Sequence, residues 1–416
     1  MANRASHNTK NRPTIMIVAG EASGDLHGGA LAEALFKIHP HAHIIGFGGT
    51  AMRAAGVDIR FDINRLGIVG LTEVLFHLKS VLLAYRLALA LLDDAIDLLV
   101  LIDFPDFNLR LAKAAKQRGL PVVYYVSPQV WAWRRGRIKT ISERIDRMLV
   151  ILPFEKTIYQ NAGISCEFVG HPLMDEFVRL GMEIPDPRQN RKDASTRSFL
   201  KEKGLDPSTV TIALLPGSRS REVTSLLPVM LKGIERLAKR IEKVQVVISV
   251  APTVAEGLIH RLCSTSPLRI GIAKGNVYPV FQASDAAVVA SGTASLQGAL
   301  SVTPMIIVYK VSWLTYGLAR WLVKIKSIAL VNIVAEQPCI PELIQGKVSA
   351  DAICNEIERL IKDAGYREKM KLALRKVADR LGAAGASERA ARAICRLLYD
   401  GPQNAPQRVR SRGETA

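Results

Sequence analysis

Short apolar runs alternate with helical stretches along most of the chain, and this alternation limits the possible folds more than any other feature. The first half contains the runs TIMIVAG, AHIIGFGG, DLLVLIDFP, PVVYYVSP, RMLVILPFE and CEFVGHP. The second half contains TVTIALLPGS, VQVVISVAP, LRIGIAKG, DAAVVASGTAS and TPMIIVYK. Strands that alternate with helices at this density predict βαβ units and mostly parallel sheets. The sequence therefore predicts an α/β protein with two doubly wound, Rossmann-like domains.

A polar, proline-bearing stretch at 185–198, PDPRQNRKDASTRS, separates the two alternating regions and predicts a linker. At 416 residues the chain exceeds one comfortable core, so two domains are expected over 13–184 and 199–384. A C-terminal helical segment closes the chain, and its last helix, at 385–400, is a candidate to complete the first domain. The ends, 1–12 and 401–416, are polar and are expected to be disordered tails.

The charge balance predicts a polyanionic partner. Lys and Arg number 56 against 38 Asp and Glu, which leaves a net charge of +18. Nucleic acid, an anionic membrane and a phosphorylated substrate all fit such an excess. The five cysteines are scattered without metal-ligand spacing, which fits a reducing cytoplasm and opposes a structural zinc site. No signal peptide or membrane-spanning run is evident.

The first glycine-rich loop, in MIVAGEASGDLHGG, follows an apolar run but carries Glu21 and Asp25 with no lysine or arginine. A phosphate would sit badly beside two carboxylates. We therefore expect this loop to bind hydroxyls or to take part in a proton transfer. A second glycine-rich turn, GFGGTA at 46–51, matches a GxGxxA dinucleotide pattern, but it follows the second strand and is interpreted as a tight turn.

The stretch DFPDFN follows the run DLLVLI and presents Asp103, Asp106 and Asn108 at the carboxyl end of a strand. The parallel arrangement brings this end to the same sheet edge as Glu21 and Asp25. A general base for a hydroxyl must lie within hydrogen-bond reach of it, and Asp106 is the candidate. The alternative is that Asp106 caps the helix that follows.

Two hydroxyl-rich turns in the second region predict an anion site. In LLPGSRSREV, Gly217, Ser218 and Arg219 come directly after a strand, and a helix is expected to begin there, with Ser218 or Ser220 as its cap and Glu222 near its third residue. The alternative is an ordinary capping box with a surface arginine. The turn SGTAS, 291–295, repeats the arrangement. Together they predict a nucleoside diphosphate site, with no metal needed where helix N-termini and Arg219 stabilise the diphosphate.

Aromatic and basic residues gather in three further segments. SPQVWAWRRGRIK contains Trp131, Trp133, Arg134, Arg135, Arg137 and Lys139, which suits base stacking, a membrane interface or a solvated helix. WLTYGLARWLVKIKS resembles a membrane-surface helix through Trp313, Arg320, Trp321, Lys324 and Lys326. An apolar stripe at helical spacing, which fits either the core or lipid, comprises Leu71, Val74, Leu75, Leu78, Val81, Leu82, Tyr85 and Leu89.

With these motifs in order, the chain from about Thr14 to Leu398 resembles the lipid-A-disaccharide synthase family of Gram-negative bacteria. The matching stretches are AGEASGD, GFGG, GIVGLTEVL, DFPDFN, SPQVWAWR, VGHPL, LLPGSRSREV, SGTASL and VNIVA. The resemblance implies a GT-B fold, with acceptor loops on the first domain facing UDP on the second across a cleft. It also implies inverting transfer of diacylglucosamine from UDP-2,3-diacylglucosamine to the 6-hydroxyl of 2,3-diacylglucosamine 1-phosphate, to form a β-1,6 disaccharide.

The resemblance also assigns candidate site residues, with Asp106 as the leading base. The candidate acceptor-binding residues are Glu21, Ser23, Gly24, Asp25, Asn108, Gln129 and Trp131. The candidate donor-binding residues are Gly217, Ser218, Arg219, Glu222, Ser291, Gly292, Thr293, Ala294, Ser295, Gln297 and Asn332. One of them departs from the family pattern, because the family usually has Glu where this chain has Gln297, and an amide offers ribose hydroxyls no charge.

The resemblance implies no cofactor and no metal, and its partners are the two acylated sugars and an anionic membrane rather than nucleic acid. We expect a cytoplasmic protein that associates peripherally with the inner membrane. The oligomeric state stays open, a dimer being one option. Three rival functions remain: another GT-B glycosyltransferase, a nucleotide-dependent oxidoreductase resting on GFGGTA alone, and a nucleic-acid-binding protein resting on charge.

Overall fold

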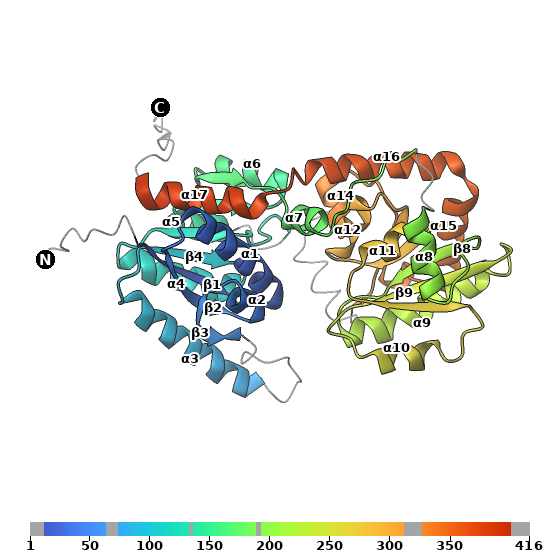
Figure 1. The fold of residues 1–416 in the computed structure, drawn as a ribbon, viewed down its shortest axis with the longest axis horizontal. Coiled ribbons are helices and arrows are strands. Elements are labelled where there is room, and N and C mark those ends of the chain that lie inside the picture. Colours follow the sequence, from blue (N-terminus) through green and yellow to red (C-terminus); the bar gives the residue numbers. More distant parts are fainter. Residues whose placement is uncertain (1–11, 64–73, 133–135, 189–192, 312–326, 401–416) are drawn as a thin grey trace, which may run out of the picture. The chain divides into compact units, whose positions relative to one another are not determined.

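The computed structural model describes residues 12–63, 74–132, 136–188, 193–311 and 327–400, without the side chains of 74–78 and 400. The chain forms two compact units (Figure 1). Unit 1 contains the residues up to Glu176 together with those from Leu381 onward, and unit 2 is Phe177–Arg380. Each unit is built on its own parallel sheet.

Unit 2 begins at Phe177, before the polar stretch 185–198 that the sequence predicts as a linker. The reason is that helix α16 (Ala364–Arg380) fastens the start of this stretch onto unit 2. Lys371 Nζ donates to the Pro187 carbonyl at 3.2 Å, and Arg375 Nη1 donates to the Ile184 carbonyl at 3.3 Å. The stretch also contains the start of α8 (Ala194–Glu202), whose first turn is capped by the carboxylate of Asp193.

The sheet of unit 1 has seven parallel strands in the order β3-β2-β1-β4-β5-β6-β7. Its strands are β1 (Thr14–Ala19), β2 (His43–Gly48), β3 (Asp58–Asp62), β4 (Leu98–Ile102), β5 (Val122–Tyr125), β6 (Arg147–Val150) and β7 (Cys166–Phe168). The central strands read as unbroken apolar runs because helices bury both of their faces. The strand order reverses between β1 and β4, which are hydrogen-bonded neighbours.

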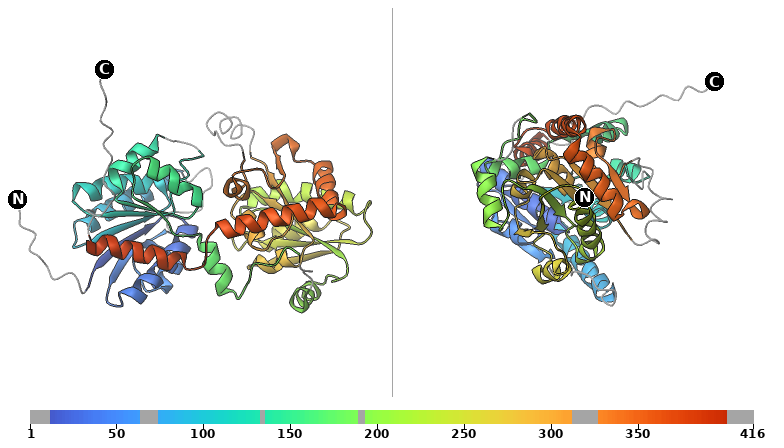
Figure 2. Two further views of the ribbon diagram at one scale, coloured as in Figure 1. Left: turned by 90° about the horizontal axis from the view of Figure 1, so that it is seen from above. Right: turned by 90° about the vertical axis from the view of Figure 1, so that its right-hand side faces the viewer.

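Helices form a layer on each face of this sheet (Figures 1 and 2). Ile15 and Ile17 of β1 belong to the core cluster that contains residues of α1 and α17, whereas Met16 and Val18 belong to the cluster that contains residues of α3, α4 and α5. The helices are α1 (Ala22–Ile38), α2 (Thr50–Ala54), α3 (Val74–Leu92), α4 (Pro105–Gln117), α5 (Arg137–Arg144), α6 (Pro153–Asn161) and α17 (Ala386–Asp400). Helix α7 (Pro172–Arg179) contains the boundary between the two units.

Helix α17 returns to unit 1 from the end of the chain and packs against α1 (Figure 2). The Asp175 carboxylate holds its start by accepting hydrogen bonds from the N–H groups of Gly385 at 2.6 Å, Ala386 at 3.0 Å and Ser387 at 3.0 Å. The last helical segment therefore completes the core of the first sheet rather than that of the second.

The sheet of unit 2 has six parallel strands in the order β10-β9-β8-β11-β12-β13, which reverses between β8 and β11. Its strands are β8 (Val210–Leu215), β9 (Val244–Val250), β10 (Ile270–Lys274), β11 (Ala286–Ala290), β12 (Met305–Tyr309) and β13 (Glu342–Ile344). Besides α8 and α16, its helices are α9 (Ser220–Leu237), α10 (Glu256–Cys263), α11 (Tyr278–Gln282), α12 (Ala294–Leu300), α14 (Leu330–Ala335) and α15 (Ala350–Lys362).

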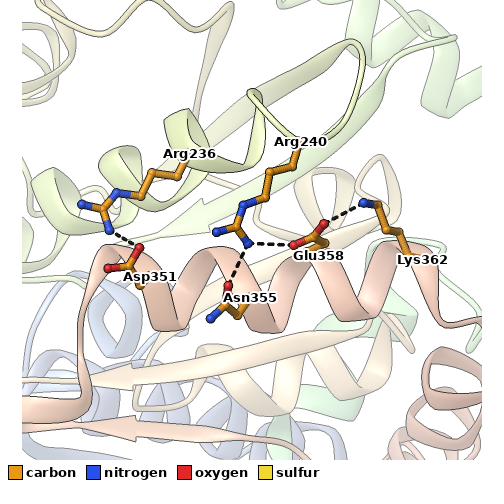
Figure 3. Close-up of polar contacts among 6 residues, drawn as sticks. All are labelled: Arg236, Arg240, Asp351, Asn355, Glu358 and Lys362. Carbon is orange, nitrogen blue, oxygen red and sulfur yellow. Dashed lines mark hydrogen bonds and ion pairs between the residues drawn. The ribbon is translucent and has the colours of Figure 1, made fainter.

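Helices α9 and α15 approach each other closely in unit 2, because a Cβ on Gly233 would lie only 2.7 Å from Ile353. A row of polar contacts runs along the pair (Figure 3). The row comprises Arg236 with Asp351, Arg240 with Asn355 and Glu358, and Lys362 with Glu358. These side chains are partly exposed, so each contact adds little stability.

None of the helices within the described ranges is long and apolar enough to cross a membrane. Of the apolar stripe, Val81, Tyr85 and Leu89 pack against the core, whereas Leu82 is exposed. Leu71 and the segment Trp313 to Lys326 lie outside the described residues, as do the side chains of Val74, Leu75 and Leu78. The described part of the stripe therefore serves mainly as core.

Candidate active site

The loops GEASGD and DFPDFN leave neighbouring strands of unit 1 at the carboxyl edge, directly at the point where the strand order reverses. Ala19 at the end of β1 pairs with Ile102 at the end of β4. The loops touch, since a Cβ on Gly20 would overlap the ring of Phe104. Ligands of open α/β sheets bind at such reversal points. The sequence-predicted residues Glu21 and Ser23 are both exposed here, and Gly24 is buried against Ala19.

The DFPDFN turn is strained. Asp103 and Phe104 both have a φ of 48°, a left-handed conformation that is unfavourable for a phenylalanine. Two buried side chains hold it, because Asn108 Nδ2 donates to the Asp103 carbonyl at 2.7 Å and the Tyr124 hydroxyl donates to the same oxygen. Strain of about 1–3 kcal/mol per residue persists only where surroundings enforce it, often at active sites. Asn108, predicted to bind the acceptor, is therefore a buried support of the turn.

Two carboxylates of this turn differ in environment. Burial, with a smaller contribution from the nearby Glu21 carboxylate, raises the pKa of Asp103 to about 6. Asp106 is exposed and forms an ion pair with Arg137 of α5. It lies in the first turn of α4 but is not the N-cap, which is Phe104. The edge thus offers one carboxylate with a near-neutral pKa and one held by a guanidinium.

Asp25, also predicted to bind the acceptor, accepts hydrogen bonds from the GFGGTA turn and the residue after it. Its carboxylate is 7% exposed and accepts hydrogen bonds from the N–H groups of Gly49 at 2.6 Å, Ala51 at 2.9 Å and Met52 at 3.1 Å. These are the donors that a dinucleotide pyrophosphate needs. Because a carboxylate already takes them, GFGGTA lacks the anion site that the oxidoreductase hypothesis requires, and Asp25 has a structural role.

Glu155 of α6, which the motifs do not predict as a site residue, accepts hydrogen bonds from two residues of the SPQVWAW loop. Trp131 is buried, and its Nε1–H donates to Glu155 Oε1 at 3.1 Å while its ring meets Phe154 edge to face. Trp131 is therefore not available to stack on a ligand, whereas Gln129 is exposed. Trp133, Arg134 and Arg135 lie outside the described residues. The sequence signal that could have identified Glu155 is an acidic residue directly after the run RMLVILPF.

The GSRS and SGTAS loops of unit 2, predicted to bind the donor, also lie at a reversal point, because β8 and β11 are neighbours with Leu215 opposite Val289. Gly217 has a φ of 116°, and a Cβ there would overlap the Glu222 carboxylate. Glu222 Oε2 accepts from the Ser218 N–H at 3.2 Å, and Arg219, whose side chain is 82% exposed, pairs with Glu222 at 3.4 Å.

Neither serine caps α9, contrary to expectation. The helix begins at Ser220 with Arg219 as its N-cap, and Arg219 makes no side-chain capping bond. Glu222 does occupy the third helical position, but it reaches back to Ser218. The geometry therefore resembles a capping box displaced by one residue, with the arginine pointing into solvent.

The SGTAS turn follows β11. Gly292 has a φ of 152° with open space where a Cβ would lie, Thr293 is the exposed N-cap of α12, and Ala294 is its first residue. Ser295 is buried and donates to the Gly292 carbonyl at 2.8 Å. Ser291 Oγ donates to the Ile328 carbonyl at 3.3 Å, and Gln297 is partly buried. The exposed part of the turn is thus at Thr293.

Asn332, predicted to bind the donor, uses its amide group for hydrogen bonds within the protein. Its Nδ2 donates to the Ile340 carbonyl at 3.0 Å and to Glu342 Oε1 at 2.7 Å. Its Oδ1 accepts from the N–H groups of Cys339 at 2.8 Å and Ile340 at 3.0 Å. An amide has little capacity beyond these bonds, so Asn332 fixes the loop before β13. Within the described ranges, no group of three or more His, Cys, Asp or Glu side chains is placed to hold a metal ion.

Comparison with known proteins gives a family match over nearly the whole chain. The family model described as lipid-A-disaccharide synthetase matches residues 15–394. The lipid-A-disaccharide synthase of Geobacter sulfurreducens is 42% identical over 394 residues, which cover 94% of this chain and 99% of that protein.

Solved structures share the fold at low sequence identity. A putative UDP-N-acetylglucosamine 2-epimerase from Listeria monocytogenes has a TM-score of 0.63 at 10% identity, covering 95% of this chain and 98% of its own. The Anabaena protein HepE in complex with UDP-glucose has a TM-score of 0.54 at 10% identity, covering 92% and 99%. These likenesses identify two parallel-sheet α/β domains of the GT-B type.

Proposed function

Since the chain belongs to the lipid-A-disaccharide synthase family, we propose that its two units divide the work of one glycosyl transfer between them. The chain is a glycosyltransferase that forms the lipid A disaccharide. In our proposal the donor is UDP-2,3-diacylglucosamine and the acceptor is 2,3-diacylglucosamine 1-phosphate. The products are the β-1,6 disaccharide 1-phosphate and UDP.

The observation that carries this assignment is the position of four loops. GEASGD and DFPDFN meet at the strand-order reversal of unit 1, and GSRS and SGTAS leave the two neighbouring strands at that of unit 2. The first pair is rich in carboxylates and suits sugar hydroxyls, whereas the second pair offers hydroxyls, backbone N–H groups and Arg219 and suits a diphosphate. The chemistry of each reversal point matches one of the two substrates.

On the donor side, Arg219 is the residue that would neutralise the diphosphate. Its guanidinium extends into solvent and forms an ion pair with Glu222. A diphosphate would compete for this exposed cation while the N–H groups of the two turns donate to its oxygens. The departing UDP would then carry its negative charge beside fixed positive dipoles.

On the acceptor side, Asp106 would take the proton of the 6-hydroxyl as that oxygen attacks the anomeric carbon. The bond between this carbon and the UDP oxygen breaks, and UDP leaves with the electron pair, so the configuration inverts. Arg137 would hold Asp106 in place until the acceptor binds. Asp103 is the competing carboxylate, because its pKa of about 6 also suits a base near neutral pH.

The acylated substrates account for the basic charge and for exposed leucines. Leu82 and Leu83 of α3 are 51% and 63% exposed, and the chain has a net charge of +18. Apolar side chains and positive charge are the features that bind a protein to an anionic bilayer. We therefore place the working enzyme at the cytoplasmic surface of the inner membrane, rather than on nucleic acid.

The direct test is to incubate the purified protein with UDP-2,3-diacylglucosamine and 2,3-diacylglucosamine 1-phosphate, and to measure both products by mass spectrometry. We expect disaccharide 1-phosphate and UDP in equal amounts, with neither formed when the acceptor is omitted. UDP-N-acetylglucosamine without acyl chains is the matched control for donor recognition. Epimerised sugar, or UDP released without disaccharide, would contradict the proposal.

A further inference from the structure

A buried carboxylate lies beneath the SPQVWAW loop. The Glu155 residue is 2% exposed, and its Oε1 accepts hydrogen bonds from Ser127 Oγ at 2.7 Å and Trp131 Nε1 at 3.1 Å. Its Oε2 accepts from the Leu152 N–H at 3.2 Å. No lysine or arginine among the described residues forms an ion pair with it. Three neutral donors from two segments therefore converge on one charge.

Burial removes water from the carboxylate of Glu155, which disfavours its ionised form. Burial raises the pKa of Glu155 to about 7, although the hydrogen bonds from Ser127, Trp131 and Leu152 act in the opposite direction. The titratable groups that sense its charge are Tyr159 and Cys166, and burial raises the pKa of each of them, so both stay neutral near pH 7. Glu155 is thus the group in this cluster whose charge changes around neutral pH.

The segment that Glu155 holds is itself strained. Val126, which starts the loop, has a φ of 62°, and left-handed backbone is a genuine outlier for a β-branched residue. The Pro128 carbonyl accepts from the Tyr159 hydroxyl at 3.3 Å, which adds a second anchor from α6. The loop is therefore fixed by α6 rather than by its own conformational preference.

This loop begins beside the DFPDFN turn. Tyr125 at the end of β5 pairs with Ile102 at the end of β4, so the two loops leave adjacent strands at the same edge. The SPQVWAW loop exposes Gln129. Because the two loops leave adjacent strands, a shift of residues 126–132 would change the surroundings of the DFPDFN turn, which contains the carboxylate proposed as the base.

We propose that ionised Glu155 is a positioning residue of the acceptor site, which acts through Ser127 and Trp131 to hold residues 126–132 in the arrangement that the reaction needs. The inference rests on the acceptor site proposed above. A protonated carboxyl group has no charge and brings a buried O–H donor into a cluster of donors, so protonation weakens the charge-assisted hydrogen bonds from the three N–H or O–H groups. The acceptor site then loosens below neutral pH.

The first test compares Glu155→Gln with Asp146→Asn over a range of pH. Asp146 is a partly buried carboxylate at the opposite edge of the same sheet, where it binds Lys116 and the Val122 N–H, which makes it a matched control. We expect wild type to lose acceptor kcat/KM below about pH 7 with an apparent pKa close to that of Glu155. This fall of kcat/KM towards low pH is the acid limb of the pH profile. Glu155→Gln should lower acceptor kcat/KM about tenfold to a hundredfold at pH 8 and should remove the acid limb. Its affinity for UDP should stay that of wild type.

Glu155→Gln places an amide NH2 among donors that the carboxylate accepted from, so a modest loss of melting temperature is expected. A purely structural role predicts this loss with normal acceptor kinetics, whereas a positioning role predicts a lower acceptor kcat/KM in the folded protein. Asp146→Asn should keep both the acid limb and the acceptor kcat/KM. Wild-type kinetics and an unchanged acid limb in Glu155→Gln would overturn the inference.

A second variant, Ser127→Ala, tests the same inference if Glu155→Gln folds poorly. Ser127→Ala removes one donor from the ionised form, so it should move the acid limb to higher pH, and an unmoved limb would contradict the inference. Trp131 fluorescence, isolated by subtracting the emission of Trp131→Phe, should titrate near pH 7 and stop titrating in Glu155→Gln. This readout needs no turnover. A wild-type protein that makes no disaccharide but shows this titration would refute the proposed function and not the link between Glu155 and the loop.

Discussion

At the scale of residues, the acceptor edge contains carboxylates that hold the fold and others that remain exposed. Asp25 accepts three backbone hydrogen bonds and is almost fully buried, whereas Glu21 and Asp106 are exposed. A carboxylate whose lone pairs are taken by N–H groups has little left for a sugar hydroxyl. Catalysis is therefore assigned to the DFPDFN turn and not to Asp25.

The first prediction concerns Arg219, which we propose to bind the diphosphate of UDP. We expect Arg219→Ala to weaken UDP binding by about 1.5–3 kcal/mol, because a charge-assisted bond to a diphosphate is lost. The Arg219 side chain is 82% exposed, so the substitution should leave the melting temperature unchanged. Isothermal titration with UDP measures the effect.

The exposed residue Arg221 supplies the control, since Arg221→Ala removes the same charge two residues further along the chain. This variant should bind UDP nearly as well as wild type. Equal losses in the two variants would indicate general electrostatic attraction, and no loss in Arg219→Ala would make Arg219 an ordinary surface residue.

The sequence predicts the type of many site residues but not their partners. Asp25, Trp131 and Asn332 all suit ligand binding by chemistry, yet each is satisfied within the protein. The partner of Asp25 lies 24 residues later and that of Trp131 also 24 residues later, so only the folded chain reveals them. Local motifs cannot distinguish a hydrogen bond to a ligand from one to a distant backbone group.

At the scale of elements, the strands at the reversal point of unit 1 are well predicted from the sequence. TIMIVA and LLVLI are uninterrupted apolar runs, and both form buried central strands of a parallel sheet. The end of the first domain was less predictable, because Arg375 of α16 binds the Pro185 carbonyl from 190 residues away. A polar, proline-rich composition marks a segment without regular structure, but it does not reveal which core that segment packs on.

Helix α3 carries the prediction on membrane binding. Replacing both Leu82 and Leu83 with serine should reduce cosedimentation with vesicles that contain phosphatidylglycerol, and high salt should weaken binding of the wild type. Both side chains are more than half exposed, so the double variant should fold normally. Circular dichroism and the melting temperature check that it does.

Leu372→Ser is the matched control, because Leu372 on α16 of unit 2 is 48% exposed and lies outside the proposed membrane surface. It should bind vesicles as well as wild type. If the α3 double variant also retains full binding, α3 is not a membrane contact and the exposed leucines need another explanation.

At the scale of the whole molecule, the chain forms two units with separate cores. Each unit has its own parallel sheet with its own reversal point, and α17 ties the end of the chain back to unit 1. Donor binding is assigned to unit 2 and proton removal to unit 1. A substitution at either edge should therefore change one property and leave the other as it was.

The measurement that tests this claim most directly is the turnover and UDP affinity of Asp106→Asn, which keeps the shape of the side chain and removes its basicity. We predict that kcat falls by a factor of about 10² or more, the usual scale for loss of a general base, while the Kd for UDP stays that of wild type. Near-normal turnover in Asp106→Asn, together with loss of turnover in a stable Asp103→Asn or Glu21→Gln protein, would contradict the account and move the base to another carboxylate of the same edge.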